Sequence, residues 1–227
     1  MINLSKGQDF DLSAGAPDLT QVRVGLGWDT GSPAPRRTAA EQDATPLSDL
    51  DVGTSDDFDF DLEWSGPEAG ADDREAACDL DVSLFMVGAN GKLPADEFFL
   101  FYNNLRSPDG AVVHQGDNRT GAGEGDDESI LISLPQVDQA VRRIVILATI
   151  HEAQQRGQSF ADVSNAYIRL VDHRSGTEVL RYALNESFSD ETAVVFGELR
   201  RDGHTWNFKA VGLGSREDLQ AFVDRYA

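Results

Sequence analysis

Short segments in which apolar and polar residues alternate run along most of the chain. In the clearest of them, every second residue from Val22 to Trp28 is apolar. Because successive side chains of a β-strand point to opposite faces of its sheet, this pattern predicts strands with one buried face. The same argument predicts further strands at 79–88, 98–103, 130–134, 143–151, 166–171, 178–184, 193–201 and 204–210.

Turn-forming residues separate several of these segments, as in 107–110 (Ser-Pro-Asp-Gly) and 201–203 (Arg-Asp-Gly). Many short strands divided in this way predict an all-β fold, an antiparallel β-sandwich. Segment 152–162 has an ambiguous pattern that fits either a helical turn or a loop. We therefore expect few helical turns besides one helix at the C-terminus.

The C-terminal helix is predicted by apolar residues at helical spacing. Ser215 is a plausible N-cap, and Glu217 and Asp218 would lie in the first turn, where carboxylates are favoured. One face of this helix should dock on the sandwich through its apolar residues, which are Leu219, Phe222, Val223 and Tyr226.

The composition describes an acidic protein with enough apolar residues for a sizeable core. The 227 residues are 40% hydrophobic and carry a net charge of −21, and we expect a single domain over 1–227. The charge argues against nucleic acid as a direct partner and against an anionic membrane surface, unless bound cations reverse the local sign. Cys78 is the only cysteine, and neither a secretory signal nor a membrane-spanning run is visible. We therefore expect a cytoplasmic protein with no transmembrane association.

Residues 31–76 form an acidic insertion with 13 acidic and 3 basic residues and low apolar content. One interpretation is an exposed acidic loop, and the other is an added element that docks a partner or collects cations. Alternating apolar residues inside it fit one extra edge strand or an anchor for a partner, and they are Phe58, Phe60, Leu62 and Trp64.

A run of carboxylates and glycines at 116–128 is the strongest chemical signal. Five carboxylates and the Asn118 amide share it with four glycines, which permit the tight backbone that turns oxygens inward. Crowded carboxylates must each face water or surround a cation, and a set of oxygen donors favours Ca²⁺. The run is not an EF-hand loop, because Arg119, Gly121 and Ala122 occupy positions three, five and six.

This run also resembles the Gly-Asp-Asn-x-Thr-Gly-x-Gly-(Asp/Glu)-Gly-Asp-Asp-Glu signature of the TerD family of tellurium-resistance and stress-response proteins. Other segments are similar to that family in the same order, namely 1–8, 22–29, 79–83, 101–110, 164–170 and 196–199. The insertion departs from the family pattern by about 40 residues. The resemblance implies a β-sandwich that holds Ca²⁺, two ions in all, and a role among other stress-response proteins in resistance to tellurite and chemical stress.

The predicted ligands combine this run with the start of one strand. Asp79 and Asp81 lie two residues apart, so both side chains point to one face of a strand. By resemblance, that strand and the acidic loop together supply the ligands Asp79, Asp81, Asp117, Asn118, Asp126, Asp127 and Glu128, with Thr120 and Gly123 as carbonyl donors. Whether Glu152 or Asn165 also binds metal stays open.

Catalysis has little support in the sequence. The four histidines lack a zinc-ligand spacing, and Gly-x-Ser-x-Gly and phosphate-binding motifs are missing. We also expect the charge of Asp79 to raise the pKa of the adjacent Cys78 thiol. The leading hypothesis is a non-enzymatic Ca²⁺-binding protein. The alternatives are an interaction scaffold with structural Ca²⁺, whose insertion docks a partner, and a metal-dependent hydrolase.

Overall fold

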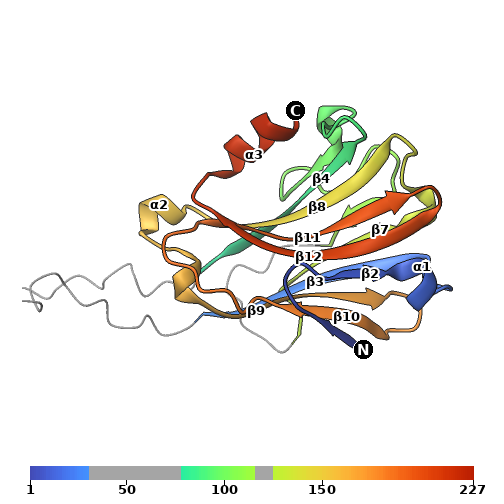
Figure 1. Ribbon diagram of the computed structural model, residues 1–227. Coiled ribbons are helices and arrows are strands. Elements are labelled where there is room, and N and C mark those ends of the chain that lie inside the picture. Colours follow the sequence, from blue (N-terminus) through green and yellow to red (C-terminus); the bar gives the residue numbers. More distant parts are fainter. Residues whose placement is uncertain (31–77, 116–124) are drawn as a thin grey trace, which may run out of the picture.

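Two six-stranded sheets pack face to face in the computed structural model, which describes residues 1–30, 78–115 and 125–227 (Figure 1). Sheet A has the order β1-β10-β9-β3-β7-β6. Its strands are β1 (Ile2–Leu4), β3 (Gln21–Thr30), β6 (Val112–His114), β7 (Glu128–Ser133), β9 (Val163–Asp172) and β10 (Glu178–Ala183).

Sheet B has the order β2-β12-β11-β8-β4-β5. Its strands are β2 (Asp9–Asp11), β4 (Leu80–Gly88), β5 (Phe99–Leu100), β8 (Val141–Ile150), β11 (Ala193–Asp202) and β12 (Thr205–Ser215). Neighbouring strands in the described ranges run antiparallel, apart from β1, which pairs with β10 in parallel. The predicted antiparallel sandwich is therefore confirmed, with this one parallel pairing added.

Alternation places one face of each sheet in a shared core. Val22, Val24 and Leu26 of β3 are almost completely buried and belong to the same cluster as Leu80 and Val82 of β4. Each fully buried aliphatic side chain contributes roughly 1.5–3 kcal/mol, so this interface dominates the stability of the fold. The register of β3 on β7 pairs Val24 with Ile130, which keeps the apolar residues of both strands on the core side.

The helical elements are short, and one of them covers sheet B. They are α1 (Leu12–Gly15), α2 (Ala153–Arg156), α3 (Leu219–Tyr226) and the 3₁₀ turns η3 (Asp96–Phe98), η4 (Leu134–Gln136) and η5 (Phe160–Asp162). Phe222 of α3 is buried against a second cluster on the outer face of sheet B, which includes Phe85 and Val145. The predicted docking of the C-terminal helix is confirmed. In the ranges described, none of the helices is both long enough and apolar enough to cross a membrane.

The start of the C-terminal helix was predicted wrongly. Ser215 is the last residue of β12, and the helix is capped three residues later by Asp218, whose Oδ1 accepts from the backbone N–H of Ala221 at 2.9 Å. The pairing of Ser215 with Ala193 of β11 extends the strand as far as the predicted cap itself.

Most of the predicted strand at 98–103 is also wrong. Only Phe99–Leu100 pairs with β4, and Phe98 ends the turn η3. Phe101 and Asn104 then exchange backbone hydrogen bonds of 3.1 and 2.9 Å, which reverses the chain. The Asn104 amide stabilises this turn because it donates to the Phe99 carbonyl at 2.6 Å.

Segment 152–162 contains both α2 and η5, so the helical interpretation holds for two short stretches of it. The predicted strand elements inside the insertion, from Phe58 to Trp64, lie outside the described residues. Three strands of only three residues each, β1, β2 and β6, were not predicted, because so short a segment shows little periodicity.

Candidate metal centre

The starts of β4 and β7, which carry predicted ligands, meet the end of β3 at one end of the sandwich (Figure 1). The indole Nε1 of Trp28 donates to the Cys78 carbonyl at 3.0 Å, which fixes the end of β3 against the start of β4. The backbone N–H of Val82 donates to the Glu128 carboxylate at 2.7 Å and brings the start of β7 to the same place.

Two glycines of β3 open a trough on the outer face of sheet A. Gly25 and Gly27 alternate with core residues, so their Cα hydrogens face outward. A Cβ at Gly25 would overlap the Asp126 carboxylate, and a Cβ at Gly27 would overlap the Tyr167 ring. Glycine is therefore needed at both positions because side chains from outside the strand lie directly on its backbone.

Asp126 lies in this trough and is held by arginines. Its carboxylate accepts from Arg169 Nε at 2.6 Å and lies 3.5 Å from Arg23 Nη1, and its side chain is only 4% exposed. Arg169 also contacts Glu178 at 3.0 Å, and Glu178 in turn accepts from Arg181. The hydrogen bond to Asp126 raises the pKa of Arg169, and the bond from Arg181 lowers the pKa of Glu178.

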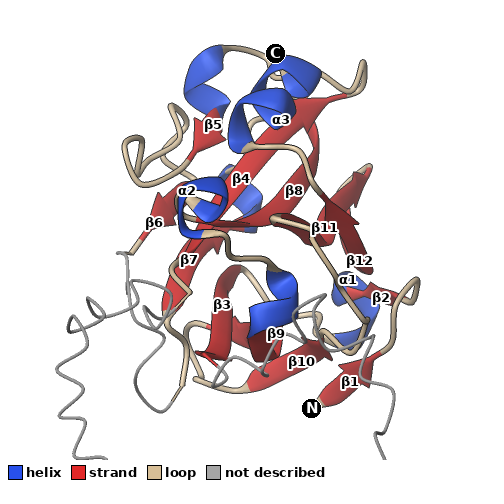
Figure 2. Ribbon diagram, turned by 90° about the vertical axis from the view of Figure 1, so that its left-hand side faces the viewer, coloured by secondary structure: helices blue, strands red, loops and turns tan. Residues whose placement is uncertain are grey.

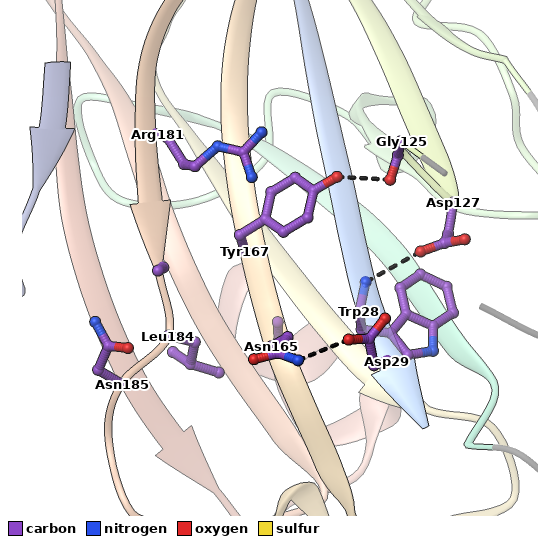
Figure 3. Close-up of a pocket in the computed structure, with 11 residues that line it drawn as sticks. Trp28, Asp29, Gly125, Asp127, Asn165, Tyr167, Arg181, Leu184 and Asn185 are labelled. Atoms are coloured by element: carbon purple, nitrogen blue, oxygen red, sulfur yellow. Dashed lines mark hydrogen bonds between the residues drawn. The ribbon is translucent and has the colours of Figure 1, made fainter. Parts of the chain in front are cut away.

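A cavity of about 370 Å³ opens beside the trough, over the end of β3 and the start of β9 (Figure 3). The carboxylates of Asp29 and Asp127 line it together with the Asn165 amide. Asn165 Nδ2 donates to Asp29 Oδ2 at 2.7 Å. The backbone of Asn165 has a φ of 52°, a left-handed conformation that is uncommon outside glycine and most tolerated by Asn and Asp.

Asp127 carries the most informative electrostatics of the cavity. Its Oδ2 accepts from the backbone N–H of Trp28 at 3.0 Å, a contact that Figure 3 shows beside the cavity. Burial is the largest cause that raises the pKa of Asp127; the Trp28 bond opposes it, and the charges of Asp126 and Asp29 add to it. The fold thus holds this carboxylate where its charge is disfavoured, a condition that a bound cation relieves.

Glu128 points the other way, between the two sheets. Its side chain is 1% exposed and lies 3.9 Å from Nε2 of the equally buried His114. Together with the bond from Val82, this places the carboxylate inside the sandwich, whereas Asp127 faces the cavity over sheet A.

Asp79 and Asp81 lie on the outer side of sheet B. They alternate with Leu80 and Val82, which face the core, and their exposures are only 7% and 8%. Asp81 Oδ2 is 3.2 Å from Nδ1 of His151. The predicted common face of the two aspartates agrees with this arrangement.

The structure therefore divides the predicted ligands among three places. Asp126 and Asp127 lie over sheet A, Glu128 lies between the sheets, and Asp79 and Asp81 lie on sheet B. Within the described ranges, no three Asp, Glu, His or Cys side chains gather closely enough to hold a metal ion. The other predicted donors lie outside the described residues, and they are Asp117, Asn118, Thr120 and Gly123.

Sequence reasoning missed Asp29 as a site residue and left Asn165 open. The available signal for Asp29 was its place directly after a strand of clear alternation, at a strand end. Glu152, also left open, lies at the start of α2 with a φ of 52° and its carboxylate 3.5 Å from Arg156 Nη2. It therefore has a structural partner within its own helix.

The Cys78 thiol lies beside this end of the sandwich and is 3% exposed. Burial raises its pKa to about 11, with a further contribution from the charge of Asp162. The pKa of the thiol is therefore raised, as predicted, but the causes are burial and the charge of Asp162, and not Asp79. A thiol in this setting is a weak nucleophile at neutral pH.

Comparison with known proteins gives a consistent assignment. The TerD domain model matches residues 1–226. The chain is 44% identical to the "Tellurium resistance protein TerD" of Alcaligenes sp, over 99% of this chain and 96% of that protein. It is 39% identical to "General stress protein 16U" of Bacillus subtilis (strain 168), over 99% of this chain and 96% of that protein.

The fold has a solved counterpart as well. The crystal structure of a telluride resistance protein (TerD) homologue from Streptomyces coelicolor A3(2) matches with a TM-score of 0.58 and 20% identity. The match covers 90% of this chain and 95% of that one. From the family match and the full-length relatives together, we conclude that the chain belongs to the TerD domain family.

Proposed function

We propose that this protein acts in the response to tellurium and other chemical stress as a non-enzymatic Ca²⁺-binding protein. The names of its relatives support the biological role, since they are called tellurium resistance and general stress proteins. The chemistry of the cavity beside β3 supports the calcium. The observation that carries the proposal is the Asp127 carboxylate, whose pKa is raised first by burial and further by the charges of Asp126 and Asp29.

The residues present fit a hard divalent cation. Asp29 and Asp127 offer carboxylate oxygens to one cavity, and the Asn165 side chain adds an amide. Ca²⁺ accepts six to eight oxygens in flexible geometry, so this set needs further donors. Asp117 and Asn118, earlier in the same acidic run of the sequence, carry oxygens of the same kind.

We assign different roles to the remaining acids. Asp126 anchors the end of the acidic run, because Arg169 and Arg23 already neutralise its carboxylate. Glu128 positions the strand ends through its bond to Val82. Asp79 and Asp81 form the core of a second cation site at the start of β4, on the other sheet.

Bound Ca²⁺ supplies positive charge that offsets carboxylate repulsion. Asp127 holds the end of β3 through Trp28, and Tyr167 holds the backbone of Gly125 with a hydrogen bond of 2.6 Å. These contacts place the start of β7 at the cavity. Cation binding therefore orders the surface around the cavity. We assign this surface to the binding of other stress-response proteins.

The settings of His114 and Cys78 support a non-enzymatic role. His114 is enclosed between the sheets, and the raised pKa of Cys78 suppresses thiolate chemistry.

In the scaffold alternative, Ca²⁺ is only structural and residues 31–76 dock the partner. Deletion of that insertion distinguishes this alternative from the main proposal. It predicts intact Ca²⁺ binding and lost association.

Thermal unfolding of the full chain in EDTA and in excess Ca²⁺ tests the proposal. A cation that binds only the folded state adds about 2.7 kcal/mol at a hundredfold excess over its Kd, which raises Tm by several degrees. Mg²⁺ at the same concentration should raise Tm less. Identical midpoints in EDTA and Ca²⁺ would remove the basis of the proposal.

A further inference from the structure

A second cavity lies on the opposite side of sheet B from the core, between α3 and the turn that follows β5. Figure 2 shows these two elements side by side at one end of the molecule. The cavity measures about 550 Å³. We call it the aromatic groove, and its apolar lining consists of Phe99, Phe101, Tyr102, Leu219 and Val223.

A ladder of rings forms one wall of the aromatic groove. Phe85 and Phe99 are stacked with centroids 4.5 Å apart, and Phe99 stacks on Phe101 at 4.6 Å. Tyr102 then meets Phe101 edge-on at 5.1 Å and is 45% exposed. The ladder thus begins in the packed cluster under α3 and ends in solvent, so its outer rings are held rigidly and remain accessible.

The rim of the groove is acidic. Asp96 and Glu97 are both exposed and line the groove, and its described lining contains no basic residue. The two arginines that flank the start and end of α3 already face carboxylates, since Arg216 pairs with Asp190 and Arg225 with Glu217. The groove therefore offers apolar ring faces beside uncompensated negative charge.

We propose that the aromatic groove binds a segment of a partner protein in which Lys or Arg residues alternate with Leu or Phe. The apolar side chains would fill the space between Phe101 and α3, and the cations would meet the rim carboxylates and the face of the Tyr102 ring. An acidic segment, a nucleic acid or an anionic membrane is disfavoured by the same charges. This surface is separate from the cavity beside β3 and does not depend on Ca²⁺.

Isothermal titration of the full chain with synthetic peptides tests this proposal. The probe is a capped decapeptide of alternating Lys and Leu/Phe, compared with a Glu-for-Lys and a Ser-for-Leu/Phe version. We expect the first peptide to bind at least about tenfold more tightly than either of the others, equivalent to about 1.4 kcal/mol. Equal binding of the Ser version would show that the rings are not used and would overturn the proposal.

Charge reversal locates the site. In the double variant Asp96→Lys, Glu97→Lys, the basic peptide should lose about tenfold in affinity and the Glu version should gain affinity. The matched control is Asp9→Lys, Asp18→Lys, which changes the net charge equally at two exposed positions, one of them on β2 at the far edge of sheet B. Equal losses in both variants would mean attraction to the overall charge of −21 and would refute the groove.

The Tyr102→Ala substitution tests the exposed ring at the outer end of the ladder. It should weaken binding of the basic peptide without lowering the Tm of the protein.

Discussion

Arg169 Nε lies 2.6 Å from Asp126 Oδ1 and fastens the end of the acidic run to the outer face of sheet A. The neighbouring Asp127 instead faces a cavity where its charge is disfavoured. Adjacent carboxylates in the same run therefore have opposite electrostatic settings: the protein neutralises the charge of Asp126, whereas burial disfavours the charge of Asp127.

The substitutions Asp126→Asn and Asp127→Asn should have opposite effects in EDTA. Loss of the Asp126 charge weakens its bond to Arg169 and should cost roughly 1–3 kcal/mol of unfolding free energy. Because the pKa of Asp127 is raised in the folded state, folding favours the protonated form of this side chain. The resulting stabilisation is complete below the unfolded pKa and is lost as the pH rises through the folded pKa. Asp127→Asn should therefore leave stability at pH 7 unchanged or increase it.

Urea unfolding of both variants in EDTA measures this difference. Addition of Ca²⁺ should stabilise Asp126→Asn more than Asp127→Asn, which keeps only the second cation site at Asp79 and Asp81. Comparable destabilisation by both substitutions in EDTA would contradict the division of roles.

Gly25→Ala should destabilise the protein through Asp126 alone. The new Cβ overlaps the Asp126 carboxylate, so the carboxylate must leave its place beside the arginines. In an Asp126→Ala background that obstacle is absent, and the same glycine substitution should cost much less. A double-mutant cycle by urea unfolding should give a coupling of roughly 0.5–3 kcal/mol; additive effects would argue against the trough.

Glu178 should contribute to the acid limb of the stability curve. Its pKa is lowered, first by the hydrogen bond from Arg181, so its contribution is present above its ordinary pKa and is lost as the pH falls through the folded value. Below about pH 5, wild-type protein should lose stability more steeply than Glu178→Gln. Chemical unfolding from pH 7 to pH 3 compares the two slopes, and parallel curves would refute this role.

Much of the fold was predictable because its core strands are periodic. The alternation from Val22 to Trp28 predicted the buried face of β3, and helical spacing predicted that α3 would dock through Phe222. The strand expected at 98–103 failed because the Asn104 side chain stabilises a turn. The helix start was misplaced because Ser215 and Asp218 are both good caps, and only the length of β12 decides between them.

The candidate site was less accessible from sequence, since its contacts join distant segments. Asn165 meets Asp29 across 136 positions, and Arg169 meets Asp126 across 43. A run of acids indicates cation chemistry by composition alone, but not which carboxylates an arginine has already neutralised. The outward glycine at position 25 is intelligible only when Asp126 is seen lying on it.

Calcium titration of the Asp127→Asn variant tests the central claim most directly. Isothermal titration should show Ca²⁺ binding to the wild type, with Mg²⁺ weaker, and a loss of at least about tenfold in Ca²⁺ affinity for Asp127→Asn. The exposed Asp18→Asn serves as the charge-matched control and should bind like the wild type. An Asp127→Asn variant that binds Ca²⁺ with wild-type affinity and stoichiometry would contradict the account.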